Sequence, residues 1–134
     1  MTVIREDDFI QSVADALQFI SYYHPLDYIE HLGRAYEREQ SPAARDAIAQ
    51  ILTNSRMCAE GKRPICQDTG IVNMFLKVGM DVRWGTKRSL ADMINEGVRL
   101  AYNHPDNKLR ASVVDDPLFA RKNTKDNSPA VFHV

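Results

Sequence analysis

The sequence has few of the features that mark specialised classes of protein. Its 134 residues include two cysteines, whereas small secreted domains that rely on disulfides normally carry more. No apolar run approaches the roughly 20 residues that are needed to cross a bilayer. The formal net charge is −1, so no overall field favours nucleic acid or an anionic membrane. We therefore expect reduced thiols, no nucleic-acid partner and no membrane partner.

What remains is the composition of an ordinary globular protein. Hydrophobic residues make up 44% of the chain and charged residues 26%, and the length suffices for one domain with a modest core. Residues 1–8 are acidic at their end and lack the basic-then-apolar order of a signal peptide. These features predict a cytoplasmic protein.

Three helices are predicted in the first 61 residues, at about 6–23, 25–39 and 41–60, because apolar residues recur at three- and four-residue steps. Ser41 before a proline is typical of an N-cap, and Gly61 is typical of a helix end. The residues predicted to point inward are Phe9, Ile10, Val13, Leu17 and Ile20 in the first helix, Leu26, Ile29, Leu32 and Tyr36 in the second, and Ile48, Ile51, Leu52 and Ser55 in the third.

After residue 61 the pattern changes. Residues 71–78 alternate between a more apolar and a less apolar face, which predicts a strand. A short extended piece holds Trp84, and Ser89 is a predicted N-cap for a helix that runs to about residue 103. Residues 130–134 begin another strand-like run. The predicted fold class is α/β (α+β-like), with a helical segment at 1–61 and an incomplete second domain, strand–helix–long loop–strand, from 62 onward.

The stretch 62–70 carries the most chemistry, because a thiol, an amide, a carboxylate and a hydroxyl follow one another before Gly70. Polar side chains where a loop enters a strand are held by rigid structure while the backbone stays able to meet a ligand. Cys66 is a candidate cluster ligand, nucleophile or small buried residue. Asp68 is a candidate acid/base, substrate contact or turn cap. Cys58 falls in the apolar pattern of the third helix, so we expect it to be structural.

Aspartic proteases also use an Asp-Thr-Gly sequence after a strand. Their chains are mostly β, and three leading helices argue against that class here.

Residues 105–129 show no clear period, and a loop of this length inside a compact domain is usually functional or disordered. Arg110 and Arg121 lie in it, and each offers a planar fork that matches a carboxylate or phosphate, although a solvated surface arginine is the ordinary alternative. Residues 123–129 are dense in hydrogen-bond donors and acceptors. This loop and the stretch around Cys66 could together bind a small anion.

Three motifs resemble those of the iron–sulfur hydro-lyases, which comprise the class I fumarases and the α subunits of tartrate dehydratase. The resemblance covers essentially the whole chain and is nearest to class I fumarases in which both halves are fused. The motifs are Arg63-Pro64-Ile65-Cys66-Gln67-Asp68-Thr69-Gly70, Lys108-Leu109-Arg110-Ala111-Ser112 and Lys122-Asn123-Thr124-Lys125-Asp126-Asn127-Ser128-Pro129-Ala130.

The resemblance implies a [4Fe-4S] cluster held by three cysteines, with an open iron that binds the substrate's hydroxyl and carboxylate. Cys66 matches the first metal ligand, and the remaining ligands would lie outside this chain. Gln67 and Asp68 match substrate-binding positions, and Asp68 is also the candidate catalytic residue that moves a proton. Arg110 matches a carboxylate-binding arginine.

The third motif contributes Asn123 and Thr124, to which we assign support of the site. We expect the N-terminal part of a class I fumarate hydratase that interconverts fumarate and (S)-malate, as a homodimer. Alternatives are another hydroxy-dicarboxylate dehydratase, such as a tartrate dehydratase, or a non-catalytic folding or assembly module. Because family members are longer, we expect this chain to need the C-terminal remainder of the enzyme or a partner subunit and to be inactive alone.

Overall fold

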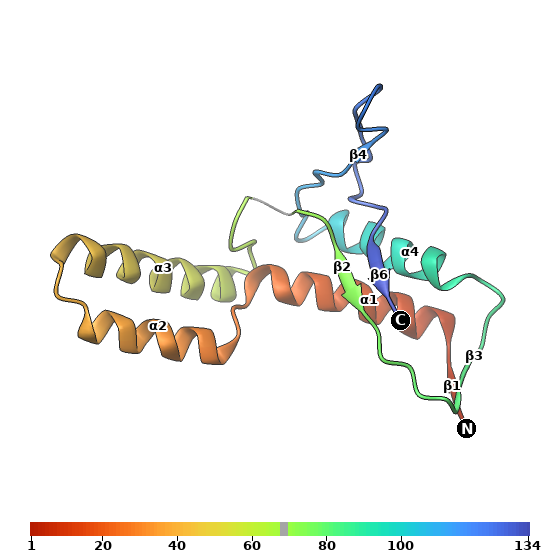
Figure 1. The fold of residues 1–134 in the computed structure, drawn as a ribbon, viewed down its shortest axis with the longest axis horizontal. Helices are drawn as coiled ribbons and strands as arrows, with labels where there is room; N and C mark the ends of the chain where they lie inside the picture. Colours follow the sequence, from red (N-terminus) through yellow and green to blue (C-terminus); the bar gives the residue numbers. More distant parts are fainter. Residues whose placement is uncertain (68–69) are drawn as a thin grey trace. The chain divides into compact units, whose positions relative to one another are not determined.

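The computed structural model describes residues 1–67 and 70–134, which form two compact units: residues 1–18 with 67–134, and residues 19–66. The predicted mixed α/β fold is confirmed, while the proposed domain division at residue 61 stays a prediction. In chain order the elements, most of them labelled in Figure 1, are β1 (Thr2–Ile4), α1 (Glu6–Tyr22), α2 (Leu26–Arg38), α3 (Pro42–Gly61), β2 (Asn73–Phe75), β3 (Val82–Trp84), α4 (Leu90–Tyr102), β4 (Val114–Asp115), β5 (Lys122–Asn123) and β6 (Val131–His133).

Local signals fix where the helices begin and end. The Oγ atoms of Ser41 and Ser89 each accept a hydrogen bond from the backbone N–H three residues on, at 3.5 Å and 3.1 Å. Both predicted N-caps are therefore confirmed. The end of α3 is one residue later than predicted. Gly61 is still helical, and Lys62 takes the left-handed conformation of the C-cap, at φ 47°.

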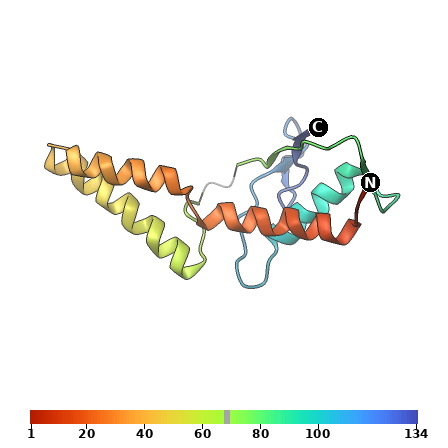
Figure 2. The same cartoon turned by 90° about the horizontal axis from the view of Figure 1, so that it is seen from below.

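The second unit contains α2 and α3, which lie side by side in both Figure 1 and Figure 2. The guanidinium of Arg45 lies 4.6 Å from the centre of the Tyr36 ring, which adds a contact between the two helices. The expectation that Leu26 and Ile20 point inward is wrong, since they are 74% and 64% exposed. A helical period defines an apolar face, but it does not supply the surface that would cover that face.

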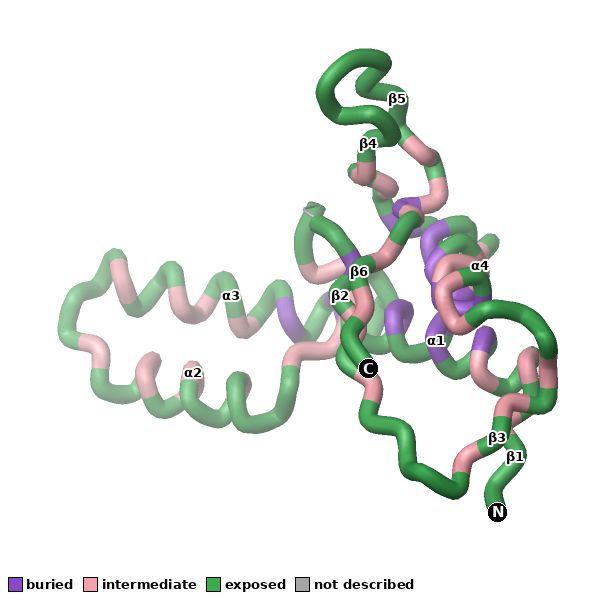
Figure 3. Tube along the Cα trace, turned by 45° about the vertical axis from the view of Figure 1, so that its right-hand side comes forward, coloured by how far each residue is buried: buried purple, intermediate pink, exposed green. Residues whose placement is uncertain are grey.

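The core of the first unit forms where α1 meets α4, and Figure 3 shows buried positions along both helices. Gly97 permits the close approach. A Cβ atom at that position would lie 2.6 Å from the Cβ of Val13 and 2.9 Å from the backbone oxygen of Ile10. The buried core residues are Val13, Ala14, Leu17, Val72, Ile94, Val98, Ala101, Tyr102 and Leu109.

Short parallel pairs of strands complete the first unit. β1 pairs with β3, and β2 pairs with β6 in the register Asn73 with Val131 to Phe75 with His133. The strand predicted at 71–78 is shorter than expected, since β2 covers only Asn73–Phe75. The predicted alternation is confirmed, because Val72 on one face is buried and Phe75 on the other face is 78% exposed. Among the described residues, no helix combines the length and the apolar character required to cross a membrane.

Candidate functional site

The polar segment after α4 contains a two-stranded hairpin that the sequence pattern did not reveal. β4 and β5 are antiparallel and pair 114–115 with 122–123 (Figure 3). The carboxylate of Asp116 closes the turn by accepting hydrogen bonds from the backbone N–H groups of Phe119 and Ala120, at 3.3 Å and 3.0 Å. Because β4 follows the second motif and β5 opens the third, the hairpin brings these two motifs together.

Asn127, which is fully buried, links all three motifs through its side chain. Its Oδ1 accepts hydrogen bonds from the backbone N–H groups of Ser112 at 2.7 Å and Val113 at 3.0 Å. Its Nδ2 donates to the backbone oxygen of Gly70 at 3.1 Å, and the Ser112 hydroxyl donates to the same oxygen at 3.2 Å. Gly70 ends the first motif, Ser112 ends the second, and Asn127 lies in the third.

Tyr102, buried at the end of α4, hydrogen-bonds to the side chain of Asn127. Burial raises the pKa of Tyr102 above its usual 10.0, and the hydrogen bond with Asn127 opposes that rise. The side chain of Asn127 thus contacts the first motif, the segment after Arg110 and the end of α4. We call Gly70, Tyr102, Ser112, Val113 and Asn127 the Asn127 network.

The backbone of the network has two residues in the left-handed region. Gly70 has φ 52° and Asn127 has φ 62°. Glycine reaches this region at no steric cost, and asparagine is among the side chains most often found there. Asn127 is therefore suited to its position by conformation as well as by hydrogen bonding.

Arg110 is exposed, but the backbone on both sides of it is held. Leu109 before it is 3% exposed and belongs to the hydrophobic core. After it, the backbone oxygen of Ala111 accepts a hydrogen bond from Asn123 Nδ2 at 2.9 Å, and Ser112 belongs to the Asn127 network. The Arg110 side chain therefore extends from a backbone whose position is held on both sides.

Thr124 also connects the third motif to the second. Its backbone N–H donates to the oxygen of Val113 at 3.0 Å, and its hydroxyl donates to the same oxygen at 3.4 Å. Asn123 Oδ1 accepts from the backbone N–H of Lys125 at 2.7 Å. These contacts agree with the support role that we assign to Asn123 and Thr124, while that assignment stays a prediction.

The other predicted site residues lie in the first motif. Cys66 is exposed, outside helices and strands, and belongs to the second unit. Gln67 is exposed and begins the long segment of the first unit. Asp68, the predicted catalytic residue, lies outside the described residues. The proposed roles of all three remain predictions.

The two cysteines differ in the way a metal site would require. Cys58 is 6% exposed in α3, and its Sγ donates to the backbone oxygen of Pro64 at 3.5 Å, as a structural cysteine would. Cys66 is exposed. Within residues 1–67 and 70–134, no group of three or more His, Cys, Asp or Glu side chains converges on one point. The assignment of Cys66 as one ligand of a cluster, with the other ligands outside this chain, stays a prediction.

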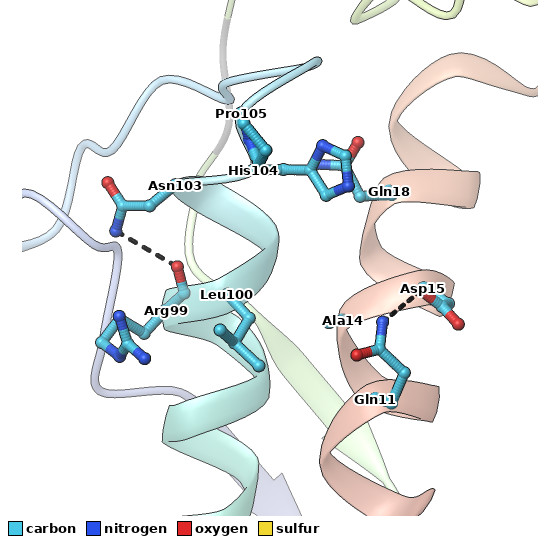
Figure 4. A pocket seen from close by; sticks show the side chains of 9 residues that line it. All are labelled: Gln11, Ala14, Asp15, Gln18, Arg99, Leu100, Asn103, His104 and Pro105. Carbon is cyan, nitrogen blue, oxygen red and sulfur yellow. Dashed lines mark hydrogen bonds between the residues drawn. The ribbon is translucent and has the colours of Figure 1, made fainter. Parts of the chain in front are cut away.

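A separate pocket of about 240 Å³ lies between α1 and α4 (Figure 4). Several of its polar groups already bind one another or the backbone. Gln11 donates to Asp15 at 2.7 Å, and Gln18 donates to the backbone oxygen of Ala101 at 2.6 Å. Arg110 and Gln67 do not line this pocket, so it is not the candidate site. Its lining residues are Gln11, Ala14, Asp15, Gln18, Arg99, Leu100, Asn103, His104 and Pro105.

Sequence reasoning missed Asn127, because the third motif reads as a loop in which every polar residue looks alike. The available signal was the density of Asn and Asp in that motif, since these side chains commonly hydrogen-bond to nearby backbone groups in turns. That signal did not distinguish Asn127 from Asn123. One of them is fully buried and the other is exposed, and burial depends on how the loop folds back on α4.

The chain belongs to the fumarate hydratase (Fumerase) family, because the sequence model of that family matches residues 10–134. This match contains all three motifs and confirms the family expected from them. The chain is also 32% identical over 115 residues to a protein of Methanocaldococcus jannaschii described as "Putative L(+)-tartrate dehydratase subunit alpha". The aligned part is 86% of this chain and 39% of that protein. The chain thus spans about two fifths of the length of this relative.

Proposed function

We propose that this chain supplies one side of the active site of a hydro-lyase that acts on a small dicarboxylate. The main support is the family match over residues 10–134, which covers all three motifs that hold the candidate site residues. The Asn127 network supports the proposal, because it ties together three motifs that are far apart in the sequence. The first candidate activity is that of a class I fumarate hydratase, which interconverts fumarate and (S)-malate.

The reaction sets clear chemical demands. Dehydration of malate breaks the C–O bond at C2 and a C–H bond at C3, forms the C=C bond, and releases hydroxide and a proton as water. A [4Fe-4S] cluster with one open iron would supply a Lewis acid for the departing hydroxyl when it is bound. Cys66 would be one of its three thiolate ligands. The other two would come from the C-terminal remainder of the enzyme or from a partner subunit.

The residues of this chain meet the remaining demands. A dianionic substrate needs a cation, and Arg110 can bind a carboxylate through two parallel hydrogen bonds. Gln67 offers an amide that can both donate and accept hydrogen bonds at the substrate. Asp68 carries the carboxylate that would move the C3 proton. We also propose that the assembled enzyme is a homodimer located in the cytoplasm.

The second candidate activity is dehydration of L(+)-tartrate, which the name of the Methanocaldococcus jannaschii relative favours. Tartrate carries a hydroxyl on both C2 and C3. Loss of water from it gives an enol that becomes a keto acid, whereas malate gives an alkene. A tartrate enzyme therefore needs a hydrogen-bond partner for the second hydroxyl, and an enzyme without that partner discriminates against tartrate.

Anaerobic reconstitution with iron and sulfide tests the proposal when the chain is assembled with the segment or subunit that supplies the other cysteines. The readouts are visible absorbance, fumarate hydration and L(+)-tartrate dehydration. We expect a cluster-loaded enzyme that hydrates fumarate. Turnover of tartrate alone would select the second activity, and turnover of neither substrate would contradict both.

A matched pair of cysteine variants tests the metal ligand. Cys66→Ser should abolish both the visible absorbance and the activity. Cys58→Ser should keep both, because a hydroxyl can still donate to the backbone oxygen of Pro64. The reverse result would refute the ligand assignment. Reconstitution of the 134-residue chain alone should give no stable cluster, and a stable and active one would show that the chain holds a complete site.

A further inference from the structure

We propose that Asn127 is a positioning residue for substrate binding, which holds the segment that carries Arg110 against the Gly70 end of the first motif. The proposal rests on the function proposed above, in which Arg110 binds a substrate carboxylate. It adds a role for a buried side chain that contacts neither substrate nor metal. This side chain fixes the position of the backbone from which the exposed Arg110 side chain extends.

The geometry of the Arg110 segment supports this role. Leu109 anchors the segment in the core on one side of Arg110. On the other side, two successive backbone N–H groups, of Ser112 and Val113, converge on Asn127 Oδ1 at 2.7 Å and 3.0 Å. Arg110 thus lies on a short bridge between a hydrophobic anchor and a polar one. Loss of the polar anchor would remove two hydrogen bonds from the bridge and leave its contacts with the core, Asn123 and Thr124.

The same amide reaches the first motif. Asn127 Nδ2 and the Ser112 hydroxyl both donate to the backbone oxygen of Gly70, at 3.1 Å and 3.2 Å. The Asn127 amide and the Ser112 hydroxyl therefore both tie the Gly70 end of the first motif to the Arg110 segment. A fork that binds a carboxylate through two hydrogen bonds tolerates little displacement, and misplacement by about 1 Å can lower a rate by about 100-fold.

Few other side chains could occupy position 127. The site combines a φ of 62°, complete burial, two accepted hydrogen bonds and a donated one. Aspartate fits the conformation and can accept, but it has no donor when ionised. Glycine fits the conformation and offers no hydrogen bond. Aspartate therefore removes only the donated hydrogen bond, whereas glycine removes the donated and the accepted ones, and neither strains the backbone.

Asn127→Asp in the assembled enzyme is the main test. It keeps the shape and both accepted hydrogen bonds, but it places a carboxylate oxygen where Nδ2 donates to the backbone oxygen of Gly70. Asn95→Asp is the matched control. Asn95 lies in α4, and its Oδ1 accepts a hydrogen bond from the backbone N–H of Ala130 at 2.9 Å, which aspartate can still accept.

We expect Asn127→Asp to lower kcat/KM for the dicarboxylate on the order of 10- to 100-fold, mainly through KM, with the cluster absorbance unchanged. Asn95→Asp should leave KM unchanged. In an Arg110→Ala background, Asn127→Asp should add little further loss, because the arginine that it positions is gone. Multiplicative effects of the two substitutions, or a loss of folded enzyme at constant KM, would overturn the proposal.

Backbone hydrogen exchange gives a readout that does not depend on activity. Asn127→Gly keeps the left-handed conformation and should expose the N–H groups of Ser112 and Val113 to faster exchange. Protection equal to that of the wild type would overturn the proposal. If Arg110→Ala leaves the kinetics unchanged, or no dicarboxylate is turned over, the proposed function fails, and hydrogen exchange by itself then decides whether Asn127 holds the segment.

Discussion

Helices α2 and α4 have the same length, 13 residues, and both have a clear apolar face, yet their environments differ. Six residues of α4 are buried: Met93, Ile94, Gly97, Val98, Ala101 and Tyr102. No residue of α2 is buried, although it lies beside α3. The comparison teaches that an amphipathic pattern defines a face, whereas burial requires a partner shaped to that face.

The partner of α4 is α1, and the fit between them depends on detail at their contact. Gly97 removes the side chain that would collide with Val13, and this lets the helix backbones approach closely. Gln18 of α1 is 6% exposed and donates to the backbone oxygen of Ala101, at the end of α4, and to that of Asn107, in the loop that follows. The second unit has a polar contact of its own, since His24 Nδ1 and Ser55 Oγ lie 3.0 Å apart.

The largest effect should come from removing a core side chain of α4. Ile94 is completely buried, so Ile94→Ala should lower the free energy of unfolding by about 2–5 kcal/mol. Leu26→Ala in α2 should change it by about 0.5 kcal/mol or less, because Leu26 is 74% exposed. Urea unfolding of both variants measures the difference. Equal losses would mean that Leu26 is covered in solution and that the comparison of the two helices is wrong.

Gly97 in α4 and Gly33 in α2 should respond to alanine in opposite directions. Gly97→Ala places a Cβ 2.6 Å from that of Val13, which should cost about 1–3 kcal/mol. Gly33→Ala in α2 meets nothing within 4 Å and should stabilise its helix by about 0.5–1 kcal/mol through helix propensity. Residue-resolved hydrogen exchange reads each helix separately. Stabilisation by Gly97→Ala would show that the helices separate easily at this contact.

A smaller effect is expected at the two serine N-caps. Ser89→Ala should cost about 1 kcal/mol, because Ser89 Oγ accepts its hydrogen bond at 3.1 Å. Ser41→Ala should cost less, because the corresponding distance is 3.5 Å, at the limit of a hydrogen bond. Thermal unfolding of the two variants shows which substitution costs more stability. A larger loss for Ser41→Ala would contradict this ranking of the caps.

The smallest effect concerns acid pH and the first unit. Hydrogen bonds from Thr86 and Arg88 hold the pKa of Glu6 below 4.5, and a hydrogen bond from Arg99 does the same for Glu96. A lowered pKa in the folded state gives stability that is present above pH 4.5 and lost as the pH falls through the folded value.

Urea unfolding at about pH 7 and about pH 3 measures this loss. Glu96→Gln should reduce the drop in stability between the two pH values, because its side chain no longer titrates. An unchanged drop in this variant would show that other groups account for the acid sensitivity.

Sequence patterns predicted the helices well, because the residues at and next to a helix end largely determine where the helix begins or ends. Ser41 and Ser89 cap the helices as expected, and the predicted end of α3 missed by one residue because Lys62, not Gly61, takes the left-handed conformation. The hairpin of β4 and β5 was not predicted. Its strands are two residues each, too short to display an alternating pattern, and its turn depends on Asp116 reaching two backbone N–H groups.

The candidate site divides in the same way. Metal and substrate roles are predicted for Cys66, Gln67, Asp68 and Arg110 from motifs that can be recognised in the sequence, and these roles stay predictions. Asn127 could not be selected in that way. Its importance comes from contacts with residues 15 and 57 positions away, at Ser112 and Gly70.

By itself, the sequence determined the helix positions, the alternation of β2, and the family, since each depends on residue type and local order. Only the tertiary structure decided that α4 is buried while α2 is not, that Cys58 is enclosed while Cys66 is exposed, and that one asparagine joins three motifs. The physical reason is that burial and hydrogen-bond satisfaction depend on which distant segments come together, and a local pattern does not contain that information.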